Sequence, residues 1–205
     1  MVEGNLMSFD VVEQFEQEVA EFFGAPYAVA TDSCTHAIEL CLRYKNIKHT
    51  ACPKNTYLSV PMTLEKLNIS WHFVDEDWYD YYYFPNTRII DAAVLWRKDS
   101  YIKNTLMCVS FQYKKHLGLG RGGIILCNNA LDHAELIKMS YDGRHRNAPW
   151  AEQEVFQMGY HYYMTPETAE LGLSKLQSAI SNVPKKWSWK DYPDLRLMPV
   201  FKNKG

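Results

Sequence analysis

The chain has 205 residues, of which 47% are hydrophobic and 22% are charged, and its formal net charge is −2. This length predicts one large domain, or one domain with a helical appendage. The balanced charge argues against nucleic acid or an anionic membrane as a partner, and no window approaches the roughly 18 apolar residues of a membrane span. The first ten residues lack the basic start and apolar run of a signal peptide.

Five scattered cysteines, at 34, 41, 52, 108 and 127, include no Cys-x-x-Cys pair. An odd number without ligand spacing favours reduced core cysteines in a cytoplasmic protein, and it predicts no zinc site.

The first elements predicted are a helix, a strand and a second helix. Asp10-Val-Val-Glu13 is typical of a capping box, and it opens an amphipathic helix that Gly24 ends. Residues 27–31 are a short strand candidate. A polar turn then leads into a helix from Thr35 to about Tyr44.

The alternation of strands and helices continues along the chain. Thr165-Pro-Glu-Thr168 is a strong helix start, with threonine as the cap and proline in the first turn. Residues 75–87 are acidic and aromatic without a clean period, so we expect a packed loop there, and residues 187–205 are expected to form a tail. Strands are predicted at 50–53, 70–74, 88–92, 106–111 and 123–127, and helices at 59–67, 131–141 and 165–180.

This order predicts an α/β fold with three layers, in which helices cover both faces of a mostly parallel sheet. Ligands of such sheets bind at the carboxyl ends of the strands. Three polar features fall at predicted strand ends: the turn at 32–35, Asp91 and Ser110. We therefore expect them to converge on one crevice.

The stretch from Ser110 to Gly123, Ser-Phe-Gln-Tyr-Lys-Lys-His-Leu-Gly-Leu-Gly-Arg-Gly-Gly, can hold a lysine amine against a small phosphorylated cofactor. Pyridoxal phosphate requires an amine for a Schiff base, an anion for its ring nitrogen, donors for its phosphate and a flat group over its ring. Lys115 could supply the amine and Asp91 the anion. Residues 33–35 at a helix start, with Ser110, could hold the phosphate.

Each of these features also has an ordinary structural explanation. A loop lysine such as Lys114 or Lys115 is commonly solvated, Asp91 could cap a loop, and the turn at 32–35 could be a simple helix cap. The glycines at 118–123 could form only a tight turn, because they lack the Gly-Lys-Ser/Thr ending of a nucleotide phosphate loop and precede a strand. The hypothesis depends on the order and shared location of the features.

In combination, the motifs resemble the DegT/StrS-type sugar-nucleotide aminotransferases, which are pyridoxal-phosphate enzymes of fold type I. Ser110-Phe111-x-x-x-Lys115-x-Leu117-x-x-Gly120-x-Gly122-Gly123 is similar to the family's Schiff-base lysine motif, with the reactive lysine at Lys115. The resemblance covers roughly residues 9–180. It is also carried by the segments Ala30–Ala37, Pro53–Tyr57, Phe73–Asp75, Asp91–Ala93, Asp142–Arg144, Gly159–Met164 and Ala169–Leu176.

The resemblance implies a role for each candidate site residue. Asp91 would keep the cofactor's ring nitrogen charged, Tyr57 would stack on the ring, and Cys34, Thr35 and Ser110 would hold the phosphate. His161 takes the place of an asparagine that the neighbouring subunit donates to the phosphate. The resemblance at this position therefore implies a homodimer with shared sites.

The chain departs from the family pattern in several places. About 15 residues, rather than about 50, separate Phe73-Val-Asp75 from Asp91, so a helix–strand–helix portion is expected to be missing. The family's small C-terminal domain is expected to be largely absent, leaving a reduced large domain at residues 1–180 and a tail at 181–205. Val94, Cys34 and Tyr163 also replace the usual residues at their positions.

By analogy, the chain would transfer an amino group from glutamate to a keto-sugar carried by a nucleotide. Three alternatives remain open. The first is a related sugar dehydratase, in which the lysine position is histidine, as it would be if His116 were in register. The second is a shortened, non-catalytic relative that acts as an assembly partner, and the third is an unrelated doubly wound domain.

Overall fold

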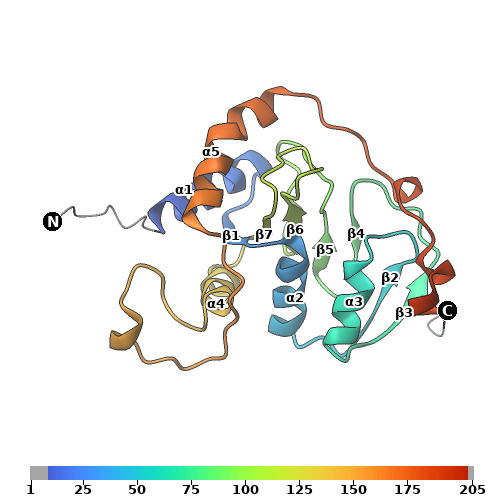
Figure 1. Ribbon diagram of the computed structural model, residues 1–205, viewed down its shortest axis with the longest axis horizontal. Coiled ribbons are helices and arrows are strands. Elements are labelled where there is room, and N and C mark those ends of the chain that lie inside the picture. The colour runs from blue at the N-terminus through green and yellow to red at the C-terminus, as the bar shows by residue number, and fades with distance from the viewer. Residues whose placement is uncertain (1–8, 203–205) are drawn as a thin grey trace.

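The structure is a computed structural model that describes residues 9–202. The prediction about a signal peptide concerns mainly residues 1–8, which lie outside the described residues. The main helices and strands, labelled in Figure 1, are α1 (Asp10–Phe23), β1 (Tyr27–Thr31), α2 (Cys34–Tyr44), β2 (His49–Pro53), α3 (Ser59–Lys66), β3 (Ser70–Val74), β4 (Tyr82–Tyr83), β5 (Ile89–Asp91), β6 (Leu106–Ser110), β7 (Gly123–Cys127), α4 (Ala130–Ser140) and α5 (Pro166–Ser181). Short 3-10 turns follow at Trp150–Glu152, Trp189–Asp191, Leu195–Leu197 and Pro199–Phe201.

Five strands form a central sheet in the order β1-β7-β6-β5-β4, and β2 and β3 form a separate parallel pair. Strand β7 runs antiparallel to both of its neighbours, β5 and β6 are parallel, and β4 is antiparallel to β5. The sheet is therefore mixed rather than mostly parallel as predicted. The glycine-rich connection between β6 and β7 contains no helix, and such a connection reverses the chain where a helical crossover would have kept it parallel.

The three-layer α/β architecture is confirmed by the packing on the two faces of the sheet. Met107 and Val109 of β6 pack with α1 and α5, whereas Leu106 and Cys108 pack with α2, α3 and α4. Side chains alternate between faces along a strand, so β6 contributes to both cores, and all five of its residues are buried. Helices on both faces leave the strand ends as the place where polar side chains can gather.

The ends of the helices partly follow the sequence signals. Gly24 ends α1 in the left-handed conformation, at φ 73°, and Thr165 caps α5 as predicted. The predicted capping box at Asp10 is wrong, because Phe9 holds the cap position and forms no side-chain cap bond. Phe9 instead packs its ring against Tyr141, with centroids 4.8 Å apart. The Phe9 backbone N–H also donates to Oδ1 of Asn147 at 2.9 Å, so contacts with distant residues hold the start of α1.

The segment between β3 and β5 is a packed loop, as predicted, with one addition. It contains the two-residue strand β4, in which Tyr82 is 3% exposed. The segment after α5 was expected to be a tail, but it packs back across the molecule, where Leu195 and Phe201 are 1% and 2% exposed. Figure 1 shows it running from α5 to the side of the molecule that holds β2, β3 and α3. The domain boundary at residue 180 stays a prediction.

Candidate active site

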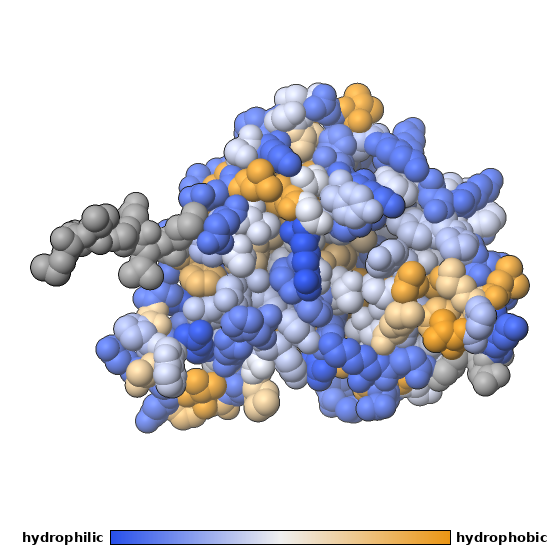
Figure 2. All heavy atoms as spheres, viewed as in Figure 1, coloured by the Kyte–Doolittle hydropathy of each residue, from blue (hydrophilic) through white to orange (hydrophobic). Residues whose placement is uncertain are grey.

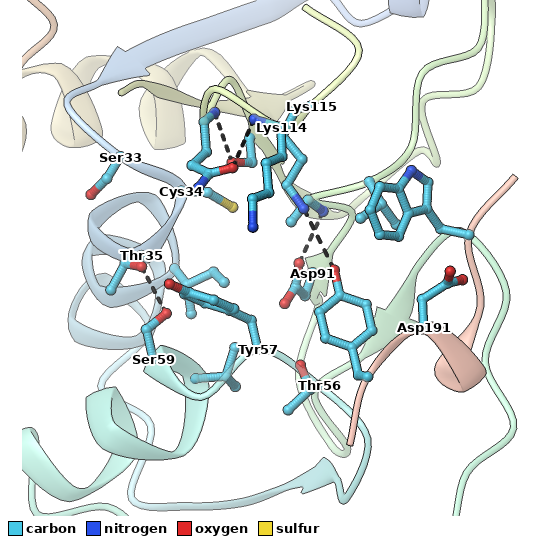
Figure 3. A pocket seen from close by; sticks show the side chains of 18 of the residues that line it. Ser33, Cys34, Thr35, Thr56, Tyr57, Ser59, Asp91, Lys114, Lys115 and Asp191 are labelled. Carbon is cyan, nitrogen blue, oxygen red and sulfur yellow. Dashed lines mark hydrogen bonds between the residues drawn. The ribbon is translucent and has the colours of Figure 1, made fainter. Parts of the chain in front are cut away.

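A cavity of about 480 Å³ opens where the start of α2, the start of α3 and the ends of β5 and β6 meet. Figure 3 shows it with the segment after α5 along one side. Its lining includes all but one of the site residues predicted from the sequence: Cys34, Thr35, Tyr57, Asp91, Ser110 and Lys115. The expected convergence at the strand ends therefore occurs.

Strand geometry brings the two halves of the cavity together. Asp91 is the last residue of β5 and Ser110 the last of β6, and these strands are parallel neighbours. At Gly123 in β7, an added Cβ would lie 2.4 Å from the backbone nitrogen of Cys34. Only glycine allows β7 to pass this closely beneath the first turn of α2. The start of α2 is thereby held beside the strand ends.

Asp91 is a buried carboxylate with two hydrogen-bond donors. The Tyr82 hydroxyl donates to Oδ2 at 2.6 Å, and the Ala93 backbone N–H donates to Oδ1 at 2.9 Å. The Thr56 hydroxyl lies 2.7 Å from that of Tyr82 and extends the chain of hydrogen bonds. Burial raises the pKa of Asp91, while these two donors and the charge of Lys115 act against the rise. An oriented carboxylate of this kind can pair with a protonated ring nitrogen.

The amine of Lys115 lies on the side of the cavity covered by the segment after α5. Its Nζ is 3.5 Å from the Tyr192 hydroxyl and 5.1 Å from the centre of the Trp187 ring. Burial lowers the pKa of Lys115, and Asp91 partly opposes the effect. A lowered pKa increases the fraction of neutral amine, which is the nucleophilic form. Lys115 and Asp91 thus face one cavity and interact electrostatically.

The first turn of α2 forms the polar end of the cavity. Ser33 caps the helix by accepting a hydrogen bond from the His36 N–H, so α2 begins at Cys34, one residue earlier than predicted. The first N–H groups of a helix have no partner within it, which favours an anion at this position. The Thr35 hydroxyl lies 2.8 Å from that of Ser59 at the start of α3. Backbone and hydroxyl groups of these types suit a phosphate.

The other predicted residues differ in how they reach the cavity. Ser110 is buried, and its hydroxyl accepts a hydrogen bond from the Gln112 N–H at 3.3 Å. Burial raises the pKa of the Cys34 thiol well above its usual range, so the group is uncharged. Tyr57 is 57% exposed and lines the opening, where an aromatic ring can cover a flat ligand.

His161 is the predicted site residue that does not line this cavity. It lies after α4, with its Nδ1 3.1 Å from Oδ2 of Asp142, and its side chain is 70% exposed. The predicted role of His161 concerns the site of a neighbouring subunit, so this position in a single chain neither supports nor contradicts it.

Sequence reasoning missed four residues that shape the site. Trp187, Asp191 and Tyr192 line the cavity from the segment expected to be a tail, and Tyr82 supports Asp91 from the expected loop. The density of aromatic residues in both segments was the available signal, because solvated tails and loops rarely concentrate tryptophan and tyrosine.

Within residues 9–202, no group of three His, Cys, Asp or Glu residues is placed to hold a metal ion. Within the same residues, no helix combines the length and apolar character needed to cross a bilayer.

Comparison with known families gives a clear assignment. The model of the DegT/DnrJ/EryC1/StrS aminotransferase family matches residues 1–99 and 102–192. The chain therefore belongs to this family, as its motifs predict. A comparison with curated protein sequences gives no match.

Solved structures with the same fold include several aminotransferase-type proteins. A protein described as a sugar aminotransferase from Streptococcus pneumoniae, in its PLP form, is 16% identical with a TM-score of 0.69; the match covers 83% of this chain and 60% of that one. 3-Amino-5-hydroxybenzoic acid synthase is 20% identical with a TM-score of 0.68, and the match covers 84% of this chain and 57% of that one. PseC of Helicobacter pylori, an aminotransferase of pseudoaminic acid biosynthesis, is 15% identical with a TM-score of 0.64. That match covers 86% of this chain and 58% of PseC.

These likenesses confirm the fold-type-I architecture, and they also show how short the chain is. It spans less than two thirds of the length of the structures it matches. The comparisons indicate pyridoxal phosphate as the cofactor, as the sequence predicts. The cavity fits this group, because a buried carboxylate, a lysine amine and a helix start lie around one space.

Proposed function

We propose that this chain is a pyridoxal-phosphate-dependent aminotransferase that moves an amino group from glutamate to a keto-sugar carried by a nucleotide. One observation carries the proposal: the Lys115 amine and the buried Asp91 carboxylate face the same cavity, beside the first turn of α2. The family assignment supports the reaction class. The glutamate donor and the nucleotide-linked sugar come from the family resemblance.

Each residue has a defined task in this proposal. Pyridoxal phosphate supplies an electron sink for amino transfer when it is bound. Asp91 would hold the protonated ring nitrogen, and Lys115 Nζ would hold the aldehyde carbon, with loss of water. Once substrate displaces it, Lys115 Nζ accepts and returns the proton that amino transfer moves. Burial lowers the pKa of Lys115, which favours the neutral amine that this task requires.

The remaining site residues position the cofactor. The first turn of α2, with Cys34 and Thr35, holds the phosphate through backbone N–H groups and a hydroxyl. Ser110 adds a second hydroxyl from the end of β6. Tyr57 covers the open side of the ring, which excludes water from one face.

We also propose a homodimer in which His161 reaches the phosphate of the partner's site. The segment between α4 and α5 exposes large apolar side chains just before His161: Trp150 is 72% exposed, Phe156 88% and Met158 80%. Figure 2 shows apolar residues at the end of the molecule built from this segment. Burial of such groups is the usual source of association energy. A cytoplasmic location accords with the five free, buried cysteines.

The second candidate function is that of a non-catalytic assembly partner, which the shortened stretch between Phe73-Val-Asp75 and Asp91 favours. Incubation of purified protein with pyridoxal phosphate and glutamate tests the choice, with 2-oxoglutarate as the product measured. Formation of 2-oxoglutarate by wild type and its loss in Lys115→Ala would support the aminotransferase. Cofactor binding without any 2-oxoglutarate would support the assembly partner. A panel of nucleotide-linked keto-sugars would then identify the acceptor.

A further inference from the structure

The segment after α5 forms one side of the cavity, although the sequence alone suggests a tail. In this segment, the backbone carbonyl of Trp187 accepts a hydrogen bond from the Asp80 N–H at 3.0 Å. The backbone N–H of Trp189 donates to the Trp78 carbonyl at 3.1 Å. The Asn55 side chain donates to the Tyr192 carbonyl at 2.9 Å. The two regions that depart from the family pattern, the shortened loop and the C-terminal segment, therefore bind each other.

This anchoring places two aromatic side chains around the Lys115 amine. The Tyr192 hydroxyl is 3.5 Å from Nζ, and the Trp187 ring centre is 5.1 Å from it. The Tyr192 ring packs on Trp78, with centroids 5.5 Å apart, which limits its movement. Both groups favour a protonated amine, because a phenol oxygen accepts its hydrogen bond and an aromatic face attracts its charge.

A second lysine shares the same tryptophan. Lys185 Nζ lies 3.7 Å from the Trp187 ring centre and forms an ion pair of 2.7 Å with Asp191. Asp191 in turn accepts the Ser188 N–H at 2.9 Å and so fixes the turn that carries Trp189. Trp187 is thus held from several directions while its ring stays beside Lys115.

We propose that Tyr192 and Trp187 are positioning residues that form a resting place for the Lys115 amine whenever it is not joined to the cofactor. The inference depends on the proposed function, in which Lys115 is released and must stay near the reacting carbon. A flexible lysine without such a place would sample many rotamers, and ordering it would then cost conformational entropy in each cycle. The C-terminal segment thereby takes part in the site and is more than a cover.

The test measures how readily the Lys115 amine reacts in the protein without cofactor. Acylation by acetic anhydride is followed as a function of pH, and peptide mapping separates Lys115 from Lys114. Tyr192→Phe keeps the ring that packs on Trp78 and removes only the hydroxyl. In this variant, the pH midpoint of Lys115 acylation should fall by about one pH unit, because the ammonium loses a hydrogen-bond acceptor. Trp187→Met keeps a long apolar side chain beside the amine and removes the aromatic face, so it should move the midpoint in the same direction.

Tyr79→Phe is the matched control, because the Tyr79 side chain is 65% exposed and does not line the cavity. It should leave the Lys115 midpoint unchanged. Midpoints that stay unchanged in Tyr192→Phe and Trp187→Met, with melting temperatures equal to that of wild type, would overturn the proposal. A wild-type chain that fails to take pyridoxal phosphate would contradict the proposed function alone, because the midpoint is measured without the cofactor.

Discussion

Tyr82 and Asp91 face each other across the antiparallel strands β4 and β5, and the Tyr82 hydroxyl donates a 2.6 Å hydrogen bond to Oδ2 of Asp91. Residues directly opposite on such strands share one face of the sheet. The acidic and aromatic loop after β3 therefore has a definite task, which is to orient the carboxylate proposed to meet the cofactor ring.

Removing this hydrogen bond should weaken cofactor binding. In Tyr82→Phe, the pKa of Asp91 should rise further, because the hydroxyl stabilises the carboxylate form. A hydrogen bond to a charged group contributes about 1.5 kcal/mol or more, so affinity should fall about tenfold. Titration with pyridoxal phosphate, followed by absorbance, measures the change. Tyr79→Phe is the control, and equal affinities in the two variants would refute the role given to Tyr82.

The buried carboxylate should make stability depend on pH in a particular direction. Burial raises the folded-state pKa of Asp91 above its unfolded value, so the folded chain binds a proton that the unfolded chain has released. The contribution of Asp91 to the free energy of unfolding is therefore present at low pH and is lost as the pH rises through its folded-state pKa. We compare the two proteins without cofactor. As the pH is raised above about 4, the free energy of unfolding should fall less for Asp91→Asn than for wild type.

Urea unfolding at several pH values checks this sign. Between pH of about 4 and neutral pH, Asp91→Asn should therefore lose less stability than wild type does. The same variant should bind cofactor poorly, which would be a trade of function against stability. A steeper loss of stability with pH in Asp91→Asn than in wild type would contradict the burial argument.

Gly123 should tolerate no side chain. In Gly123→Ala, the new Cβ would lie 2.4 Å from the Cys34 nitrogen and 2.5 Å from the Ser33 carbonyl carbon, so backbone must move. Overpacking of this kind costs about 1–3 kcal/mol, and displacement of α2 should also weaken phosphate binding. At Gly120, nothing lies within 4 Å, so Gly120→Ala should carry only the cost of its φ of 86°, about 1–2 kcal/mol. Urea unfolding and cofactor titration compare the two; normal cofactor affinity in Gly123→Ala would show that α2 is not held in this way.

The proposed homodimer predicts complementation between two inactive variants. Lys115→Ala lacks the amine of its own site, and His161→Ala lacks the residue donated to the partner's site. In a mixed dimer, one site would carry both lesions and the other neither, so mixing should restore 2-oxoglutarate formation. Enzyme assays before and after mixing measure this, and Lys115→Ala mixed with itself is the control. No recovery despite exchange of subunits would place His161 outside the shared site.

Much of the fold could be predicted from local patterns. Strands β1 and β7 have the predicted bounds, because an apolar run between polar or glycine residues marks a buried strand. The capping box did not form at Asp10, because Phe9 holds the cap position and contacts Tyr141 and Asn147, which lie far away in the chain. The antiparallel course of β7 also escaped prediction, since strand direction depends on the geometry of a connection rather than on composition.

The site residues, like the fold, could be predicted only in part. Lys115 and Asp91 could be located from motif order, since both follow strands that end at one edge of the sheet. Tyr192 and Trp187 could not. Tyr192 is held by Trp78 and Asn55, and Trp187 by Asp80, and all three partners lie more than a hundred residues away in the chain. The aromatic residues of this segment indicate that it packs, but without periodicity they do not indicate which residues it packs against.

The central claim is that Lys115 forms the covalent link to pyridoxal phosphate. Borohydride reduction of the protein with bound cofactor, followed by peptide mapping, tests it most directly. The pyridoxyl group should appear on Lys115, be absent from Lys115→Ala and be retained in Lys114→Ala. A modified Lys114, or no modified lysine at all, would contradict it.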